Sequence, residues 1–307
     1  MNRKGGCSMS MQTETVLDRD SESYLSNVLA RFRKNRFGMV GLLILTMLAL
    51  VALLSPYIVP HDPHRPVPTE DGPPRSWQAP SSRHILGTDS VGRDVFSRLV
   101  AGTRVSLSVG LVATAMTIAI GILVGAVAGY YGGWVDAVLM RLVDIIICFP
   151  VLLMLIALST LMAPSLINVM FIIGIAFWTG TARIVRGEFL KLRSLEFVQA
   201  ARAVGAYPSR IVIRHILPNA VSPIIVNATL RVAYAILMET SLSFLGVGVQ
   251  EPLPSWGRML NQAMSFTVLD GRPWIWIPPG IAILVTVLSI NFVGDALRDA
   301  VDPKLRT

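Results

Sequence analysis

The stretch GMVGLLILTMLALVALLSPYIV, residues 38–59, decides the class of fold, because none of its side chains is charged. An α-helix of about 20 apolar residues crosses the hydrocarbon core of a bilayer, which is about 30 Å thick. The stretch is longer than the apolar region of a signal peptide, which has about 7 to 15 residues, and it follows a mostly polar segment. We therefore expect residues 38–59 to form a retained membrane-spanning helix.

Similar apolar stretches recur along the rest of the chain. They cover residues 105–130, 135–162, 166–184, 220–244 and 274–293. Hydrophobic residues make up 53% of the 307 residues and charged residues only 15%, compared with about 25% in soluble domains. The mean hydropathy is +0.59. This composition argues against a soluble enzyme and predicts an all-α integral membrane protein with six transmembrane helices.

Glycines repeat at four-residue intervals in the second stretch, at Gly121, Gly125 and Gly129. A helix face without side chains lets another helix approach closely enough for extensive van der Waals contact. We interpret this repeat as a helix-packing signal rather than as part of a solute site.

The net charge of +8 comes from basic residues that lie between the apolar stretches. One group lies at residues 31–36, before the first stretch, and a larger one lies at 183–214, between the fourth and fifth. By the positive-inside rule both groups are cytoplasmic, and an even number of spans then places both termini on the cytoplasmic side. We expect the partner of these charges to be the lipid bilayer and not a nucleic acid.

Composition divides the chain into four parts. We expect a disordered cytoplasmic tail at 1–23, an interfacial helix with the first span at 24–60, a proline-rich extracytoplasmic loop at 61–104, and a core of five spans at 105–307 that contains a cytoplasmic loop at 188–219. A plain cytoplasmic helix that leads into the first span is an equal alternative to the interfacial helix.

The cytoplasmic loop contains the sequence FVQAARAVGAYPSRIVIRHILPN, residues 197–219. Its alanine-rich part predicts a helix over 198–204, Gly205 suits a left-handed cap, and Pro208 suits the first turn of a second helix over 208–214. The loop is therefore expected to form a helix, a glycine corner and another helix.

The side chains of the first short helix suit insertion into a cleft of another protein. Ala200 and Ala201 keep the helix thin, while Arg202 and Arg210 could pair with acids at the rim of such a cleft. On physical grounds alone, a solvated loop is an equal alternative.

This loop resembles the EAA loop of ABC-importer permeases, in which Glu-Ala-Ala is followed by three residues, a glycine and a downstream Ile/Leu-Pro. The corresponding positions here are Gln199, Ala200 and Ala201, then Gly205, then Leu217 and Pro218. Gln199 replaces the usual glutamate, which removes a charge but keeps the hydrogen-bonding capacity.

Three further blocks, at residues 84–110, 243–260 and 291–306, resemble the C-type membrane subunit of the dipeptide/oligopeptide/nickel permease family. The resemblance extends over about 24–306. It implies the type I ABC-importer permease architecture in a bacterial-type inner membrane. It also implies a second homologous permease subunit, two cytosolic ATP-binding subunits and an extracytoplasmic solute-binding protein as partners.

The sequence offers no Walker A loop, since none of Lys4, Lys34, Lys191 and Lys304 follows a glycine. We expect no cofactor on this chain, and ATP and Mg on the partner ATPase subunits. The chain itself is then a permease and not an enzyme, and the motion must reach it through a cytoplasmic contact. The residues expected to make this contact are Gln199, Ala200, Ala201, Arg202, Gly205, Arg210, Leu217 and Pro218.

The predicted function is the ATP-driven import of di-/oligopeptides or a similar small solute by alternating access. A secondary transporter driven by an ion gradient is the alternative, although no inverted repeat is visible. An intramembrane enzyme is disfavoured, because all four histidines lie outside the proposed spans and neither H-E-x-x-H nor G-x-S-x-G occurs.

Three charged residues lie inside the apolar stretches: Asp144, Arg231 and Glu239. A charge at the bilayer centre costs roughly 2.5 to 3.5 kcal/mol, so these side chains should face protein or water. They are candidates for the translocation path, with an inter-helix ion pair or hydrogen bond, or snorkelling of Asp144, as the alternative. Arg231 and Glu239 are eight residues apart, about 12 Å along a helix, so they need separate partners.

Two outer segments, 84–98 and 246–261, could dock the solute-binding protein or form an outer gate, or they could only seal the outer vestibule. The candidate residues are Asp89, Arg93, Asp94, Gln250, Pro254 and Trp256. The sequence His61-Asp62-Pro63-His64 is weak evidence for a metal site, and we expect a surface loop there.

Overall fold

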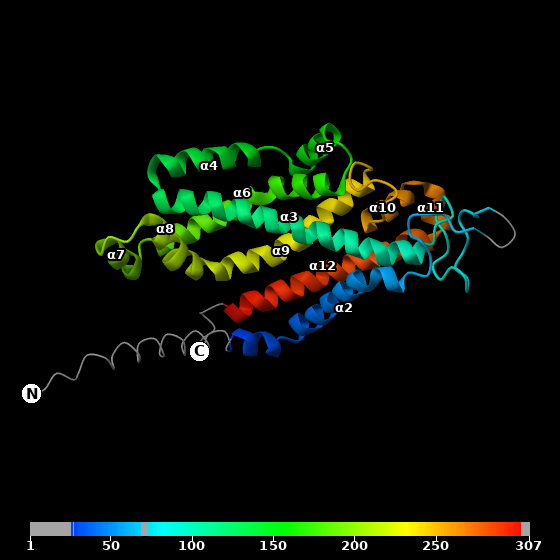
Figure 1. Ribbon diagram of the computed structural model, residues 1–307, viewed down its shortest axis with the longest axis horizontal. Coiled ribbons are helices and arrows are strands. Elements are labelled where there is room, and N and C mark those ends of the chain that lie inside the picture. The colour runs from blue at the N-terminus through cyan, green and yellow to red at the C-terminus, as the bar shows by residue number, and fades with distance from the viewer. Residues whose placement is uncertain (1–25, 27, 69–72, 302–307) are drawn as a thin grey trace, which may run out of the picture.

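A computed structural model describes residues 26, 28–68 and 73–301 of the chain. Figure 1 shows a bundle in which the long helices run side by side along one axis. The predicted tail at 1–23 lies outside the described residues. The elements are α2 (Arg36–Ile58), α3 (Val95–Tyr131), α4 (Gly133–Ile147), α5 (Val151–Leu161), α6 (Leu166–Leu192), α7 (Glu196–Ala203), α8 (Pro208–Arg210), a π-helix (Ile211–Ile216), α9 (Leu217–Phe244), α10 (Trp256–Asn261), a 3₁₀ turn (Gln262–Met264), α11 (Phe266–Gly271) and α12 (Pro273–Val301).

Five helices in the described part of the chain are long and apolar enough to cross a membrane, and the pair α4 and α5 would make a sixth span. The all-α membrane class is therefore confirmed. The span expected over 135–162 is not one straight helix, because the chain bends by 85° between α4 and α5. Pro150 explains the break, since a proline disfavours helical backbone in the residue before it and has no N–H to donate.

Helix α3 begins ten residues before the expected start of its span, so the outer loop ends at Asp94 and not at residue 104. Asp94 starts the helix because its side chain accepts a hydrogen bond of 2.8 Å from the Ser97 N–H, as an N-cap residue does. Helix α6 likewise continues to Leu192, past the expected end at 184. Both helices thus project beyond the apolar stretches that the sequence marks.

The glycine repeat packs α3 against α6, as predicted. A Cβ at Gly125 would lie 2.5 Å from the Ala182 carbonyl oxygen, and one at Gly129 would lie 2.5 Å from the Phe189 Cβ. Gly121 makes the same kind of approach to α6. Any larger residue at these positions would separate the two helices, so the repeat fixes how closely they pack.

The first span packs on the last one. A Cβ at Gly41 of α2 would lie 2.6 Å from the Ser289 carbonyl oxygen of α12. Residues 28–34, which are helical and precede α2, bury Phe32 against Ala296 and Ala300 of α12. Figure 1 shows α7 and α8 at one end of the bundle and α10, α11 and the long loop at the other.

Candidate functional site

The loop between α6 and α9, which we call the coupling segment (196–218), has the predicted helix and glycine corner. Helix α7 ends at Ala203, and Gly205 adopts a left-handed backbone with φ of +78°. The Ala206 N–H donates to the Ala201 carbonyl at 3.1 Å, as expected for a glycine-ended helix. The left-handed cap that the sequence predicts at Gly205 is therefore present.

The second short helix differs from the prediction, because it does not end at residue 214. Pro208 begins α8, which continues through the π-helix into α9, so that 208–244 is one continuous helical element. The Leu217 N–H donates to the Val212 carbonyl, five residues back. This shift in register comes directly before Pro218, which has no N–H to donate.

The outward face of the coupling segment is open. Val198 is buried and packs on Val185 and Phe189 of α6, whereas Val204 and Tyr207 are 83% and 78% exposed. Beside them lies a hollow of about 530 Å³. Of the residues predicted to make the cytoplasmic contact, the structure gathers Ala200, Ala201, Gly205 and Arg210 around this hollow.

The other predicted residues have different surroundings. The Gln199 side chain donates to the Ser194 carbonyl at 3.1 Å, so it stabilises the start of α7. Leu217 and Pro218 lie in the first turn of α9 and are not among the residues that line the hollow. Arg202 stacks over the Tyr130 ring, with 5.1 Å between its Cζ atom and the ring centroid.

Contacts that the sequence analysis missed fasten the base of the coupling segment to α3. The Arg193 guanidinium donates to the carbonyls of Gly129 and Tyr130 at 3.1 and 3.2 Å, where the last carbonyls of a helix need partners. Arg186 of α6 donates to the Asp136 carboxylate of α4 at 2.6 Å. In the sequence, the clustered arginines predicted only the orientation of the chain in the membrane. Their partners could not be predicted, because these lie in distant parts of the chain.

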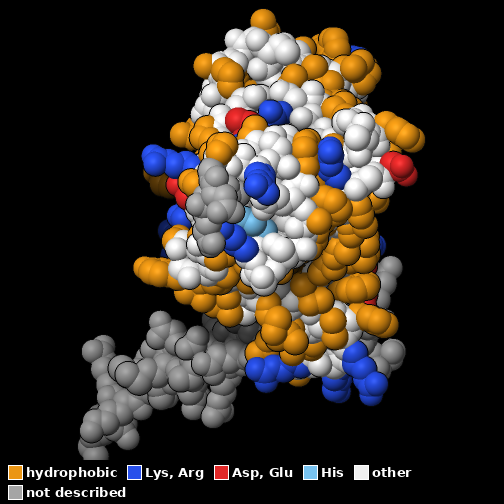
Figure 2. Space-filling view, turned by 90° about the vertical axis from the view of Figure 1, so that its right-hand side faces the viewer, with side chains coloured by type: hydrophobic (Ala, Val, Ile, Leu, Met, Phe, Trp, Pro, Cys, Tyr) orange, Lys and Arg blue, Asp and Glu red, His pale blue; other side chains and the backbone are white. Residues whose placement is uncertain are grey.

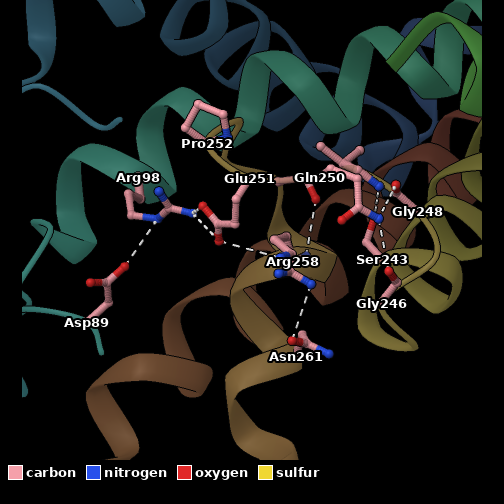
Figure 3. Close-up of polar contacts among 12 residues, drawn as sticks. Asp89, Arg98, Ser243, Gly246, Gly248, Gln250, Glu251, Pro252, Arg258 and Asn261 are labelled. Carbon is pink, nitrogen blue, oxygen red and sulfur yellow. Dashed lines mark hydrogen bonds and ion pairs between the residues drawn. The ribbon is translucent and has the colours of Figure 1, made fainter. Parts of the chain in front are cut away.

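At the opposite end, five charged side chains form what we call the outer cluster: Asp89, Arg93, Arg98, Glu251 and Arg258. Figure 3 shows Asp89, Arg98, Glu251 and Arg258 of this cluster. Arg93 Nε lies 2.7 Å from Asp89, and Arg93 also pairs with Glu251. Glu251 Oε1 lies 3.3 Å from Arg98 and 3.4 Å from Arg258. The cluster joins the loop before α3 and the first turn of α3 to the loop between α9 and α10 and to α10 itself.

The arrangement of charges in the outer cluster depends on Glu251. The Arg98 side chain is only 1% exposed, and the Glu251 side chain is 35% exposed. Burial raises the pKa of Glu251, but the hydrogen bond from Arg93 and the charges of Arg98, Arg93 and Arg258 lower it by more, so the net pKa is below the ordinary value. Glu251 is therefore ionised under neutral conditions and holds three arginines together.

Other predicted outer residues are buried or hold the loops in place. Trp256 is fully buried, and its indole N–H donates to the Leu99 carbonyl at 3.2 Å. The Gln250 side chain donates to the Gly246 carbonyl at 2.9 Å. Pro254 is buried beside α3, in a hollow of about 640 Å³.

Three side chains of the kinds that bind metals lie close together beside these loops. Of the sequence at 61–64, only His61 belongs to this group. His61, His84 and Asp94 place one ligand atom each within 4.8 Å of one another. The Asp94 oxygens already accept from His84 Nδ1 at 2.9 Å and from the Ser97 N–H and hydroxyl. These hydrogen bonds hold the start of α3 in place, and they explain why the three side chains lie together.

The three intramembrane charges lie apart. Asp144 accepts from Arg183 of α6 at 2.6 Å, and both side chains are about half exposed. Glu239 is fully buried and accepts from the hydroxyls of Ser106 and Ser243 at 3.2 and 2.7 Å. Arg231 is half-buried, and within the part of the chain that the structure describes no hydrogen bond or ion pair reaches it. Arg231 and Glu239 thus have separate surroundings, and only Glu239 has hydrogen-bond partners among the described residues.

Figure 2, viewed onto the outer end, shows Lys and Arg side chains spread over a face that is otherwise mostly uncharged. Arg65, Arg75 and Arg83 of the long loop are exposed there. The end that carries the outer cluster therefore exposes basic side chains among uncharged ones, hydrophobic side chains included.

Comparison with known proteins adds to this picture. Residues 121–307 match the family described as the binding-protein-dependent transport system inner membrane component, and residues 23–80 match the N-terminal TM domain of oligopeptide transport permease C. The dipeptide transport system permease protein DppC of Bacillus subtilis is 42% identical, over 94% of this chain and 88% of its own length. The glutathione transport system permease protein GsiD of Pectobacterium atrosepticum is 40% identical, over 90% of each chain.

Among solved structures, a chain of the MetNI methionine ABC transporter in inward-facing conformations is similar, with a TM-score of 0.56 and 19% identity. The match covers 67% of this chain and 97% of that chain, and at this identity it supports the fold alone. Together with the family matches, it leads to one assignment. The chain belongs to the family of binding-protein-dependent transport system inner membrane components.

Proposed function

We propose that this chain is the membrane-channel subunit of an ATP-driven importer that takes up di-/oligopeptides or a similar small solute across a bacterial-type inner membrane. The single observation that carries the proposal is the open coupling segment with its left-handed corner at Gly205. The family membership and the names of the relatives, which include dipeptide and glutathione transport permeases, support it.

The coupling segment acts as the receiving part for the motion of a separate ATPase. Its hollow and the exposed Val204 and Tyr207 take up side chains of an ATP-binding subunit. Because 208–244 is one continuous helical element, a displacement at Pro208 moves α9 as a whole. Arg193 and Arg202 carry the same displacement to the end of α3. The two helices then alternate the access of the solute between the two sides.

The remaining partners follow from this assignment. A second, homologous permease subunit completes the channel, and two cytosolic ATPases bind ATP and Mg, whereas this chain binds no cofactor. An extracytoplasmic solute-binding protein docks on the outer face beside the outer cluster, where Asp94, Pro254 and Trp256 shape the loops from within. Both termini are then cytoplasmic, on the same side as the coupling segment.

Among the intramembrane charges, Arg231 is the one that meets the solute. Glu239 has its hydrogen bonds satisfied inside the bundle, and Asp144 is paired with Arg183. These two residues therefore support the helices, while the guanidinium of Arg231, which has no ion-pair partner among the described residues, remains available to a solute.

Reconstitution into proteoliposomes tests the proposal. The complete set of two permeases, two ATPases and the binding protein should accumulate a labelled dipeptide only when ATP is supplied, and omission of the ATPases should abolish uptake. Uphill uptake by this chain without ATPases, driven by a proton or sodium gradient, would instead support the secondary transporter and contradict the proposal.

A further inference from the structure

A cavity of about 500 Å³ lies between α6, α9 and α12, at the end of the bundle that carries the coupling segment. Its volume lies within the range of about 300 to 1,000 Å³ that is typical of small-molecule sites. Ile184, Glu188 and Lys191 line it from α6, Asn227 lines it from α9, and Arg298 lines it from α12. It is distinct from the hollow of the coupling segment, with which it shares no lining residue.

The charged side chains of the cavity have no partners among the residues that the structure describes. Neither a hydrogen bond nor an ion pair joins Glu188, Lys191 or Arg298 to another side chain in 28–68 or 73–301. The neighbouring face of α6 is different, since Arg183 is paired with Asp144 and Arg186 with Asp136. The cavity therefore gathers three charged side chains that are not paired with other described side chains; Glu188 is half-buried, whereas Lys191 and Arg298 are exposed.

Arg231 lies one helical turn beyond the cavity toward the middle of the membrane. It follows Asn227 by four residues in α9, which places the two on the same side of the helix. Its guanidinium rests on Gly180, and a Cβ at Gly180 would collide with Arg231 Nη2. Gly180 precedes Ile184 by one turn of α6. The glycine thus makes room for a guanidinium one helical turn from the residues that line the cavity.

The spacing between the deep cation and the acid of the cavity selects a solute length. Gly180 and Glu188 are eight residues apart on α6, which corresponds to about 12 Å along the helix. An extended chain of n residues spans about 3.3 to 3.6 Å times n, so three or four residues span this distance. Lys191 and Arg298 give the cavity more positive than negative charge, which disfavours cationic solutes.

From this juxtaposition we infer that the cavity is a release-side binding site for a short peptide of three or four residues. The carboxylate end of the peptide pairs with Arg231, and its amine end pairs with Glu188. A guanidinium and a carboxylate form strong, charge-assisted hydrogen bonds, which favour a free carboxylate over an uncharged amide. The inference rests on the proposed function, because it identifies the site at which the imported solute is held before release.

Equilibrium binding to the complete membrane complex, purified without nucleotide and without the binding protein, tests the inference. We expect trialanine to bind wild-type complex, and both its C-terminal amide and its N-acetyl derivative to bind at least about tenfold more weakly. This comparison needs no variant, so it does not depend on how well any substitution folds.

Two substitutions assign the ends of the peptide. Arg231→Gln should abolish the preference for the free carboxylate over the amide, and Glu188→Gln should abolish the preference for the free amine over the acetylated form. Arg183→Gln is the matched control, because it removes the same charge from another face of α6, and it should keep both preferences.

The inference is overturned if trialanine does not bind the wild-type complex, as when a helix of the second permease or a lipid fills the cavity. It is also overturned if the amide binds as well as the free peptide, or if Arg231→Gln retains the preference. Uptake by the wild-type proteoliposomes separates the two proposals: ATP-dependent accumulation without end-group preference rejects this site alone, whereas no ATP-dependent accumulation rejects the proposed function.

Discussion

The two ends of this helix bundle differ in whether their charged and apolar side chains have partners within the chain. In the outer cluster, five charged side chains from two regions far apart in the sequence, 89–98 and 251–258, are paired with one another, and Arg98 is almost completely buried. In the coupling segment, Arg210 and the apolar Val204 and Tyr207 are exposed, and only Val198 is fully buried among the described residues of α7. The charges of the outer cluster are paired within one chain, whereas the coupling segment leaves an exposed and hollowed surface.

The largest effect is expected where the outer end loses its central acid. Glu251→Gln leaves Arg93, Arg98 and Arg258 with Asp89 as the remaining acid of the cluster, and uncompensated buried charge is costly. Because Glu251 is partly exposed, we expect a loss of stability of about 2 kcal/mol rather than the larger values of fully buried pairs. Thermal unfolding of the purified complex measures it.

Asp270→Asn provides the control for that measurement, since Asp270 is an exposed acid at the same end of the molecule. An equal decrease in the melting temperature for both variants would show that the outer cluster contributes nothing beyond surface charge.

The coupling segment should respond to backbone strain instead of lost charge. A Cβ at Gly205 would meet no neighbouring atom within 4 Å, but the residue has φ of +78°. Gly205→Leu therefore costs about 1 to 2 kcal/mol through the left-handed backbone alone. We expect binding-protein-stimulated ATP hydrolysis in the reconstituted importer to fall roughly tenfold.

Asparagine tolerates the left-handed region better than leucine. Gly205→Asn should therefore retain most of the stimulated hydrolysis. Unchanged stimulation in Gly205→Leu would mean that the corner does not take part in coupling.

The pH dependence of stability distinguishes the two ends further. The pKa of Glu251 is lower in the folded chain than its value of about 4.3 in an unfolded one, so its pairing stabilises the fold fully above about pH 5. This contribution is lost as the pH falls through the lowered pKa. Melting temperatures from pH 7 to pH 3 should decrease more steeply in the wild type than in Glu251→Gln, and parallel curves would argue against the assignment.

The smallest effect is expected at the base of the coupling segment. Tyr130→Leu removes the ring under the Arg202 guanidinium, an interaction worth about 0.5 to 1 kcal/mol. Amide hydrogen exchange in α7 should rise by about two- to fivefold. Tyr131→Leu is the matched control, because Tyr131 is exposed and no arginine lies over its ring in the described structure. Equal exchange in both variants would show that the contact does not hold α7.

Local features of the sequence predicted much of this molecule. Apolar length identified the membrane class, the glycine spacing in α3 predicted close packing on α6, and Gly205 predicted the corner of the coupling segment. Each of these depends on residues within a few turns of one another. The bend at Pro150 was also readable in principle, because a proline inside an apolar stretch disfavours a straight helix.

Long-range pairing was not predictable in the same way. Arg93 and Glu251 are 158 residues apart, so no local pattern indicates that they meet. Arg202 was expected to pair with an acidic residue of a partner protein, but in the fold its guanidinium lies over the Tyr130 ring. Periodicity and motifs thus predict elements and their apolar faces, while the identity of the contacts depends on how the helices assemble.

The proposed mechanism requires an ATPase on another chain to drive this one through the coupling segment. A photo-cross-linking residue in place of Val204, which is highly exposed beside the hollow, tests it directly in the reconstituted importer. We predict that light links this chain to an ATP-binding subunit, and that the yield changes when ATP is added. Cross-links to lipid or to the second permease only, with no ATP-binding subunit captured in either state, would contradict the account.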